Sequence, residues 1–256
     1  MKQMKTLLVL LCVLLAACAL SGCIGGSDDN STNSTNNTTN NTTNNTTNTT
    51  YNPVTTITFE INNATVAANE IIQINLPGNL GSNGSWTYTP VDGLNVVTAE
   101  DAISKNISYM ISAKQAGTYN FTAVYKNDKN ETVYSVTQKL VYDEAPATTP
   151  SGGPVIVITY DGVPTPKTTE VIQIQTRGNP TTGYQWTALM SENGMLRLLD
   201  SEYIQDPAEE GMVGVGGTYV WYVTSNIAGT YMFDAQETHA GDDEPVAVFF
   251  MDVTFV

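Results

Sequence analysis

Side chains that perform nucleophilic or metal-assisted chemistry are scarce in this chain. All three cysteines, Cys12, Cys18 and Cys23, lie within the first 23 residues, and His239 is the single histidine. A nucleophilic enzyme needs a base beside its nucleophile, and a zinc enzyme needs several clustered His or Cys ligands. No glycine-rich phosphate loop is present, and no pair of acids stands out on a recognisable frame. We therefore predict that the protein is not an enzyme and that it uses neither a cofactor nor a metal.

The first 22 residues have the pattern of a secretory signal. Lys2 and Lys5 precede a short apolar run, Leu7–Leu15, which falls well short of the roughly 20 apolar residues of a membrane-spanning helix. The segment Leu20-Ser-Gly-Cys23 that ends it resembles the lipobox of prokaryotic lipoproteins. That resemblance implies cleavage before Cys23 and a diacylglyceryl group on its sulfur, and hence a cell-membrane protein facing the extracellular side. A plain secretory signal with incidental cysteines is the alternative.

Residues 23–51 are almost wholly Asn, Thr, Ser, Gly and Asp. Such a segment buries too little apolar surface to fold, so we predict a disordered tether between the lipidated Cys23 and the folded part. It is rich in Asn-x-Thr/Ser sequons, which glycans could extend. The formal net charge is −15 and no basic cluster occurs, which argues against nucleic-acid binding and favours a soluble monomer.

The rest of the chain contains an internal repeat. Glu70–Ile74 matches Glu170–Ile174, and Trp86 matches Trp186, both at an offset of 100 residues. Ala116–Ala123 matches Ala228–Ala235 at an offset of 112, so the second copy carries 12 extra residues. The copies are separated by a Pro/Gly/Thr-rich linker. The predicted divisions are a signal peptide (1–22), the tether (23–51), a first domain (52–145), a linker (146–153) and a second domain (154–256).

Both copies have the pattern of short β-strands. Apolar and polar residues alternate in segments such as Ile172–Ile174, turn residues recur between them, and no long helical period is present. We predict an all-β protein with two tandem immunoglobulin-like β-sandwich domains. The Ala-Gly-Thr-Tyr before a strand resembles a tyrosine corner, which assigns that role to Tyr119 and Tyr231. Trp86 and Trp186 are predicted to pack between the sheets rather than contact a ligand.

Two loops of the second domain carry the most specific motifs. The first reads Asn179-Pro180-Thr181-Thr182-Gly183-Tyr184, and the second reads Gly214-Val215-Gly216-Gly217, inside the 12-residue insertion. Together they resemble the Asn-Pro-Thr-Thr-Gly-aromatic loop and the Gly-x-Gly-Gly loop of the chagasin family of cysteine protease inhibitors. The resemblance covers about residues 155–256. Ordinary turns are the alternative, because Asn-Pro and Gly-Gly are common turn signals.

The resemblance implies reversible inhibition of a papain-like cysteine protease. In that family the first loop occupies the active-site cleft and two others flank it. Pro180 restricts its own backbone and that of Asn179, and Gly183 permits a tight turn, so the loop is pre-organised. Pre-organisation lowers the entropy lost on binding. The glycines of the second loop would allow close backbone approach to the enzyme.

The third loop departs from the family pattern. At the position of the family's Arg-Pro-Trp motif the chain has an acidic hairpin with His239, Ala240 and Gly241 followed by Asp242. Arg and Trp are the residues that most often dominate interface energy, so potency or target choice is expected to differ. The acidic loop could favour a protease with a basic rim, or be a solvated hairpin tip. One histidine among flexible carboxylates is a weak metal signal.

The first domain is predicted to have lost the inhibitory loop. Its equivalent segment reads Asn79-Leu-Gly-Ser-Asn-Gly-Ser85, without the proline and the paired threonines. The glycosylation candidates of this domain are Asn63, Asn83, Asn106, Asn120 and Asn130. We interpret the first domain as a spacer and support. The predicted function is a lipid-anchored inhibitor, and the alternative is a structural or adhesive surface module.

Overall fold

The computed structural model describes residues 50–63, 65–81, 83–144, 153–189 and 194–256. The predicted signal peptide, Cys23, the tether up to residue 49 and most of the linker lie outside the described residues, so these assignments stay predictions. The described residues belong to one compact unit. In the part of the chain that the structure describes, no helix has the length and apolar character needed to cross a membrane.

The described residues fold into β-strands with one short 3-10 turn, as the alternating pattern predicted. The first repeat contains β1 (Thr55–Ile61), β2 (Ile71–Leu76), β3 (Ser85–Tyr88), β4 (Leu94–Glu100), β5 (Ile107–Ala113), β6 (Gly117–Lys126) and β7 (Thr132–Tyr142). The second contains β8 (Pro154–Gly162), β9 (Ile172–Gly178), η2 (Pro180–Thr182), β10 (Tyr184–Leu189), β11 (Leu196–Gln205), β12 (Gly217–Ser225), β13 (Gly229–His239) and β14 (Pro245–Phe255).

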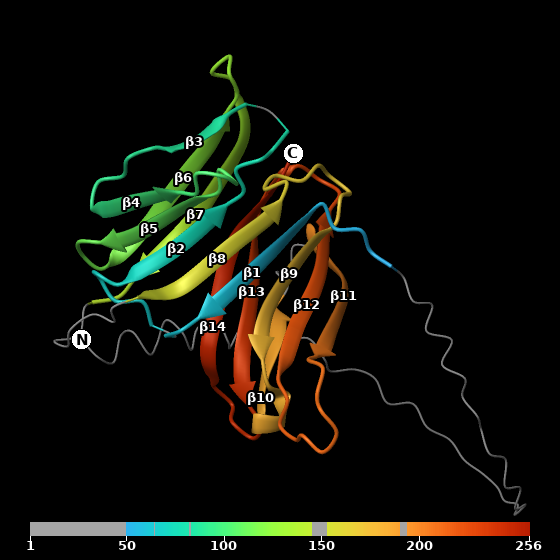
Figure 1. Ribbon diagram of the computed structural model, residues 1–256. Coiled ribbons are helices and arrows are strands. Elements are labelled where there is room, and N and C mark those ends of the chain that lie inside the picture. Colours follow the sequence, from blue (N-terminus) through green and yellow to red (C-terminus); the bar gives the residue numbers. More distant parts are fainter. Residues whose placement is uncertain (1–49, 64, 82, 145–152, 190–193) are drawn as a thin grey trace, which may run out of the picture. The chain divides into compact units, whose positions relative to one another are not determined.

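The strands form two β-sandwiches that share a sheet (Figure 1). The shared sheet has the order β11-β12-β9-β1-β8-β2-β5-β4. One half of it faces the sheet β3-β6-β7 and the other half faces the sheet β10-β13-β14. The ring of Tyr109 on β5 lies 5.1 Å from that of Phe121 on β6, and the ring of Trp221 on β12 lies 5.6 Å from that of Phe233 on β13. The predicted all-β sandwich architecture is confirmed.

The first strand of each repeat lies in the sandwich of the other repeat. β1 runs parallel to β9 of the second repeat, and β8 runs parallel to β2 of the first repeat, while β1 and β8 pair antiparallel with each other. The predicted boundaries 52–145 and 154–256 describe the repeats of the sequence. In space the repeats are joined by this exchange of strands, which the sequence pattern does not predict.

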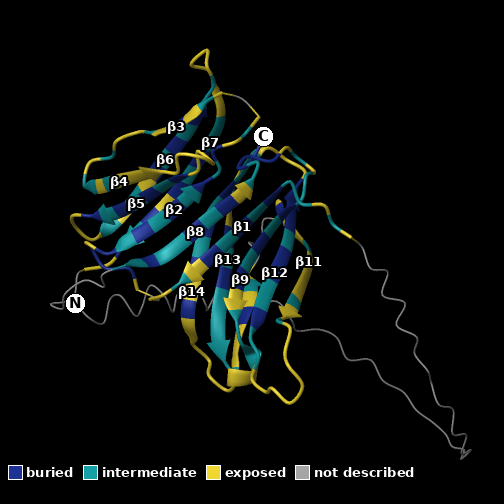
Figure 2. Cartoon of the chain, viewed as in Figure 1, coloured by how far each residue is buried: buried dark blue, intermediate teal, exposed yellow. Residues whose placement is uncertain are grey.

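Buried residues alternate with more exposed ones along the strands, as the dark blue bands of Figure 2 show, and most of the buried residues are apolar. Trp86 and Trp186 each expose only 7% of their surface, so the prediction that both belong to the core is confirmed. The Trp86 indole Nε1 also donates a 2.8 Å hydrogen bond to the carbonyl of Pro77. This bond satisfies the one polar atom that the buried indole carries.

Both predicted tyrosine corners are present. The Tyr119 hydroxyl donates to the carbonyl of Gln115 at 3.0 Å, and the Tyr231 hydroxyl donates to the carbonyl of Ile227 at 2.8 Å. Each bond reaches four residues upstream, as the repeated Ala-Gly-Thr-Tyr motif requires. The two copies therefore use the same device to fix the turn into their longest hairpins.

A second repeated motif precedes β2 and β9. The carboxylate of Glu70 accepts the backbone N–H of Ala67, and that of Glu170 accepts the backbone N–H of Lys167, each at 2.7 Å. Asn69 and Thr169, one residue before each acid, both have a positive φ, of 74° and 72°. The sequence match at an offset of 100 thus corresponds to the same turn in both repeats.

Strands β7 and β14 touch through a polar cluster. The buried Gln138 side chain donates from Nε2 to the Tyr160 hydroxyl at 2.6 Å and to the carbonyl of Asp252 at 2.9 Å. The backbone N–H of Lys139 donates to the carboxylate of Asp252 at 3.2 Å. Burial raises the pKa of Asp252 above its ordinary value, against the opposing effects of the Lys139 hydrogen bond and charge.

Candidate functional site

The first predicted loop is a 3-10 turn held in shape by its own side chains. Asn179 has an extended backbone (φ −142°, ψ 92°) and its Oδ1 accepts the Thr181 N–H at 3.2 Å and the Thr181 hydroxyl at 2.7 Å. The Thr182 hydroxyl donates to the Asn179 carbonyl at 2.6 Å. Pro180 occupies the first position of the turn, where its missing N–H costs no hydrogen bond. The threonine hydroxyl protons are therefore used inside the loop, and the oxygens keep lone pairs that can accept.

Gly183 ends this turn and packs on the third loop. It has φ 89°, in the left-handed region that favours glycine, and a Cβ there would lie 3.0 Å from the His239 Nε2 atom. The Gly183 carbonyl accepts the N–H of Ala240 at 2.8 Å. The rings of Tyr184 and His239 are 4.8 Å apart between centroids. The first and third loops are thus joined by a hydrogen bond and by ring packing.

The second loop, between β11 and β12, is tied directly to the first. The Asn179 side chain donates from Nδ2 to the carbonyl of Gly214 at 2.7 Å. Gly214 has φ 75°, and a Cβ on it would lie 3.7 Å from the Thr181 hydroxyl. The structure therefore brings all three predicted loops together at one end of the second sandwich, the lower end in Figure 1, near the label of β10.

At two positions at the base of the loops, neighbouring atoms leave room only for glycine. Gly178 and Gly217 pair across β9 and β12. A Cβ on Gly178 would lie 2.7 Å from the ring of Tyr219, and one on Gly217 would lie 2.4 Å from the carbonyl of Ile204. Gly217, assigned to protease binding from the sequence, is buried, whereas Gly214 is exposed and Gly216 is half-buried. The second-loop motif thus combines Gly217, which packing requires, with Gly214 at the surface.

An ion pair closes the base of the second loop. Both guanidinium NH groups of Arg177 donate to the carboxylate of Asp206, and the Asp206 N–H donates to the Gly216 carbonyl at 3.0 Å. The hydrogen bond from Arg177 holds the pKa of Asp206 below its ordinary value. In the first repeat a proline, Pro77, replaces Arg177. The second repeat alone therefore carries this clamp.

The surface around the loops is acidic. Glu209 and Glu210 lie in the second loop, and Asp242, Asp243 and Glu244 lie in the third, all exposed. His239 Nδ1 is 3.2 Å from the carboxylate of Asp242, so the histidine supports the hairpin. Within the described ranges no three His, Cys, Asp or Glu side chains come together in a way that could hold a metal ion.

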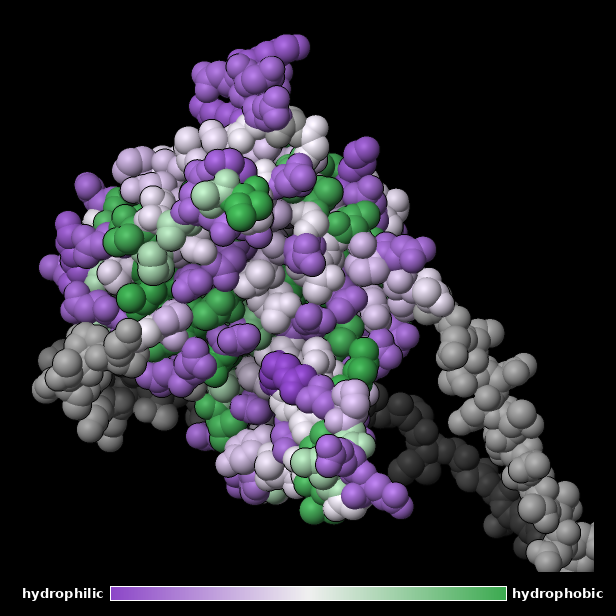
Figure 3. Space-filling model, viewed as in Figure 1, coloured by the Kyte–Doolittle hydropathy of each residue, from purple (hydrophilic) through white to green (hydrophobic). Residues whose placement is uncertain are grey.

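Sequence reasoning missed two apolar residues at the tip of the second loop. Val213 exposes 94% of its surface and Met212 exposes 62%, directly before Gly214. Figure 3 shows apolar, green surface beside hydrophilic surface at this end of the second sandwich. Exposed apolar side chains next to a recognition loop are candidates for a binding anchor. The sequence signal that could have indicated their exposure is their position in an acidic loop, directly before the glycine motif.

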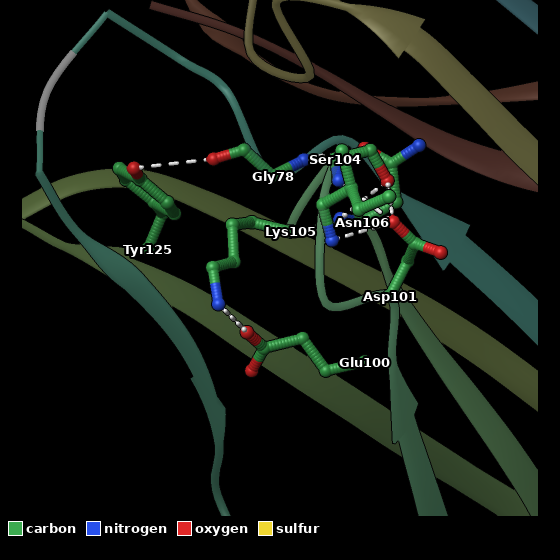
Figure 4. A network of polar contacts seen from close by, with 8 residues as sticks. Gly78, Glu100, Asp101, Ser104, Lys105, Asn106 and Tyr125 are labelled. Atoms are coloured by element: carbon green, nitrogen blue, oxygen red, sulfur yellow. Dashed lines mark hydrogen bonds and ion pairs between the residues drawn. The ribbon is translucent and has the colours of Figure 1, made fainter.

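The same end of the first repeat is built differently (Figure 4). Its shorter β4–β5 loop is closed by the carboxylate of Asp101, which accepts the N–H of Ile103 and both the N–H and the hydroxyl of Ser104 at 2.7–3.0 Å. The Lys105 ammonium lies 3.4 Å from the carboxylate of Glu100. The first repeat thus has a compact loop, closed by its own hydrogen bonds, where the second repeat has the longer glycine-containing loop.

In the first repeat, the base of the loop that corresponds to Asn179–Gly183 is fixed by hydrogen bonds to Gly78. The side chain of Asn106 accepts the N–H of Gly78 at 2.9 Å, and the Tyr125 hydroxyl bonds the carbonyl of Gly78 at 3.4 Å. A hollow of about 610 Å³ beside these groups is lined by both Asn83 and Asn106. Asn63, Asn83, Asn106, Asn120 and Asn130 are all exposed, and their glycosylation stays a prediction.

Comparison with known proteins identifies the second repeat. Residues 165–253, which include all three loops, match the family model described as Chagasin family peptidase inhibitor I42. The C-terminal repeat is chagasin-like. The matched family consists of peptidase inhibitors rather than enzymes, which agrees with the prediction made from the missing nucleophile. No curated protein matches the chain significantly.

Solved structures give weaker likenesses. A cysteine protease inhibitor from Entamoeba histolytica is 24% identical over 34% of this chain and 79% of its own, with a TM-score of 0.30. Amebosin is 29% identical over 36% of this chain and 86% of its own, also with a TM-score of 0.30. Domains 5–6 of the S-layer protein SbsC are 11% identical over 80% of this chain, all of their own length, with a TM-score of 0.25. At these TM-scores the assignment of the chagasin-like repeat rests on the family match.

Proposed function

We propose that the protein inhibits papain-like cysteine proteases by inserting the Asn179–Gly183 loop into the active-site cleft. The observation that carries this proposal is the hydrogen bond from Asn179 to Gly214, which places the two family motifs side by side. A chagasin-like repeat whose motif loops lay apart could not contact one cleft with both. Here the first loop lies between the second and third, bonded to each.

The geometry of the first loop suits reversible blockage of a cleft. Thr181 and Thr182 project as exposed residues from a turn whose backbone is fixed by Pro180, Asn179 and Gly183. A 3-10 turn does not present an extended peptide bond to a nucleophile, so the loop is a poor substrate while it fills the site. The threonine oxygens, with their protons already donated within the loop, are available to accept from a catalytic imidazolium.

The second and third loops are proposed to set affinity and target choice. Met212 and Val213 offer the exposed apolar surface that the third loop lacks, since that loop has neither the Arg nor the Trp of the family motif. The acidic side chains of both flanking loops favour a protease with a basic rim. Opposite charges on the two proteins accelerate association, whereas an acidic rim on the protease would be repelled. The inhibition should therefore weaken as salt is raised.

We further propose that the inhibitor acts at the outer face of the cell membrane. The lipobox-like segment ending in Cys23 would supply the anchor, and a diacyl anchor holds a protein at a membrane far more firmly than one chain does. The Asn/Thr-rich segment up to residue 51 would give the inhibitor reach. Metabolic labelling with a fatty acid, followed by Cys23→Ser, tests this part separately. Label that persists in the variant would contradict it.

The inhibitory function is tested by titrating the whole chain against papain and a cathepsin L-like protease while peptide hydrolysis is followed. We expect reversible inhibition that Thr181→Ala with Thr182→Ala weakens at least about tenfold, within the range of interface hot spots. Asn79→Ala with Asn83→Ala, in the equivalent loop of the first repeat, is the matched control. A folded chain that inhibits neither protease would favour a structural or adhesive module. Inhibition that is lost only in the control would instead place the inhibitory loop in the first repeat and contradict the proposal.

A further inference from the structure

The exchange of first strands is reciprocal and follows one register. Ile57 of β1 pairs with Ile174 of β9, and Ile158 of β8 pairs with Ile74 of β2. Ile74 and Ile174 are equivalent residues of the two repeats. β1 and β8 therefore occupy the same place in opposite sandwiches, each completing the repeat to which it does not belong in sequence.

Side-chain hydrogen bonds repeat across the exchange. The Gln175 amide donates to the hydroxyl of Thr58 at 3.0 Å, and the Asn75 amide donates to the hydroxyl of Thr159 at 2.9 Å. The sequences around these threonines read Ile-Thr-Phe-Glu in β1 and Ile-Thr-Tyr-Asp in β8. The exchange is thus built from two equivalent strands with an aromatic residue, Phe59 or Tyr160, at the same position.

Phe59 of the first repeat lies at the base of the loops of the second. It is fully buried, and its ring stacks on Phe249 with centroids 3.9 Å apart. It contacts Trp186 edge-on at 5.4 Å and lies parallel to Trp221 at 6.1 Å. Its carbonyl accepts the hydroxyl of Thr176 at 2.8 Å.

Each of these four partners belongs to a strand that carries one of the loops. Thr176 is on β9, which leads into the first loop, and Trp186 is on β10, which leaves it. Trp221 is on β12, which leaves the second loop, and Phe249 is on β14, which leaves the third. A single side chain from the first repeat therefore contacts the support of all three loops at once.

We propose that the protease-binding site is composite, with β1 of the first repeat as a structural part of it and Phe59 as a positioning residue for the three loops. The first repeat is then more than the spacer and support that its sequence suggested. The predicted effect on inhibition rests on the proposed function, whereas the position of β1 in the second sandwich does not. Phe59 acts through Trp186, Trp221 and Phe249, since it is buried and touches no protease.

Matched variants separate this arrangement from the ordinary one, in which each repeat keeps its own strand. Phe59→Leu removes the ring beneath the loops and keeps an apolar side chain in place. Tyr160→Leu makes the equivalent change in the other sandwich. We expect Phe59→Leu to weaken inhibition about tenfold, the effect of a modest loss of binding energy, and Tyr160→Leu to leave it unchanged. The reverse result, or no effect of Phe59→Leu, would overturn the proposal.

The NMR signals of the tryptophan indoles report where the Phe59 ring lies, which a general loss of stability would not imitate. The chain has three tryptophans, and loss of the Phe59 ring current should shift the Nε1–H signals of Trp186 and Trp221 in the NMR spectrum. The signal of Trp86, in the first sandwich, should stay in place. A shift of Trp86 alone would show that Phe59 belongs to the first sandwich and would refute the composite site.

A disulfide cross-link tests whether β1 lies beside β9 of the same molecule, even if the chain inhibits no protease. In the whole chain with Cys12, Cys18 and Cys23 replaced by serine, Thr58→Cys with Gln175→Cys should form a disulfide within one molecule. Thr58→Cys with Asn75→Cys should stay reduced, because Asn75 lies beside Thr159. A disulfide in the Asn75 pair, or one that links two molecules in the Gln175 pair, would overturn the intramolecular exchange. Failure of inhibition with the expected cross-link would instead contradict only the proposed function.

Discussion

Asn179 and Gly214 lie 35 residues apart in the sequence and are joined by a 2.7 Å hydrogen bond between a side-chain amide and a backbone carbonyl. The same asparagine side chain also caps the turn that contains Pro180 and Thr181. One residue thus shapes the first loop and attaches it to the second. Its two roles use different atoms, Oδ1 for the cap and Nδ2 for the attachment, so substitution can separate them.

Replacing Asn179 should weaken inhibition in two stages. Asn179→Asp keeps an acceptor for the Thr181 N–H but cannot donate to Gly214, so it tests the attachment alone. Asn179→Ala removes both. Because each hydrogen bond contributes about 0.5–1.5 kcal/mol, we expect the alanine variant to lose about tenfold in affinity and the aspartate variant less. Inhibition assays give the constants, with Asn79→Ala as the control. Equal affinities for all variants would contradict the attachment's role.

Removing the apolar tip of the second loop should reduce affinity without reducing stability. Met212→Ser with Val213→Ser changes two residues that are already exposed, so the unfolding temperature should stay the same. Loss of an apolar anchor in a complex costs about 1–2 kcal/mol or more. Ile103→Ser is the matched control, since Ile103 is 94% exposed on the corresponding loop of the first repeat. An inhibition constant that stays the same would show that the tip does not contact the protease.

The ion pair between Arg177 and Asp206 should titrate at low pH. Asp206 has its pKa lowered from the ordinary 3.8, chiefly by the hydrogen bond from Arg177. A lowered pKa means that the clamp is intact above 3.8 and is lost as the pH falls through the lower, folded value. Carboxyl NMR signals should show this midpoint, and Arg177→Met should move it upward. A midpoint that does not respond to Arg177→Met would contradict the clamp.

Asp252 should make the protein more stable in mild acid than at neutral pH. Burial raises the pKa of Asp252, so the folded state takes up its proton before the unfolded state does as the pH falls. Stability therefore rises as the pH is lowered from 7 through the raised pKa. Urea unfolding at several pH values should show a smaller rise for Asp252→Asn than for the wild type. Asp128→Asn, in an exposed turn, should match the wild type, and a profile identical in all three proteins would argue against this assignment.

Much of the fold could be predicted because its local signals are strong. Alternation within short segments, repeated turns and the Ala-Gly-Thr-Tyr motif indicated the strands, the sandwich and the hydroxyl bonds of Tyr119 and Tyr231. The meeting of the three loops was implied by the resemblance of their motifs to the chagasin family. These features depend on residues close in sequence or on the regular order of antiparallel strands.

The strand exchange could not be predicted, for a physical reason. β1 and β8 share an Ile-Thr pair followed by an aromatic and an acidic residue, and their apolar residues alternate in the same way, so the pattern fits either sandwich. Which strand enters which sandwich depends on the segments between them, and nothing in alternation or turn chemistry encodes that choice. The apolar tip was missed for another reason. Met212 and Val213 are residue types that usually indicate a core, and only the structure shows them at the surface.

The position of β1 determines how the folded part would respond to a pull on its tether. A force directed along the chain from residue 50 first reaches β1, which lies between β8 and β9 and is bonded on both sides. A force in line with the strand would shear both ladders together, so the seven residues of β1 would resist as a unit rather than separate one at a time. Tension on the segment before β1 would therefore be transmitted to both sandwiches at once, through β8 on one side and β9 on the other.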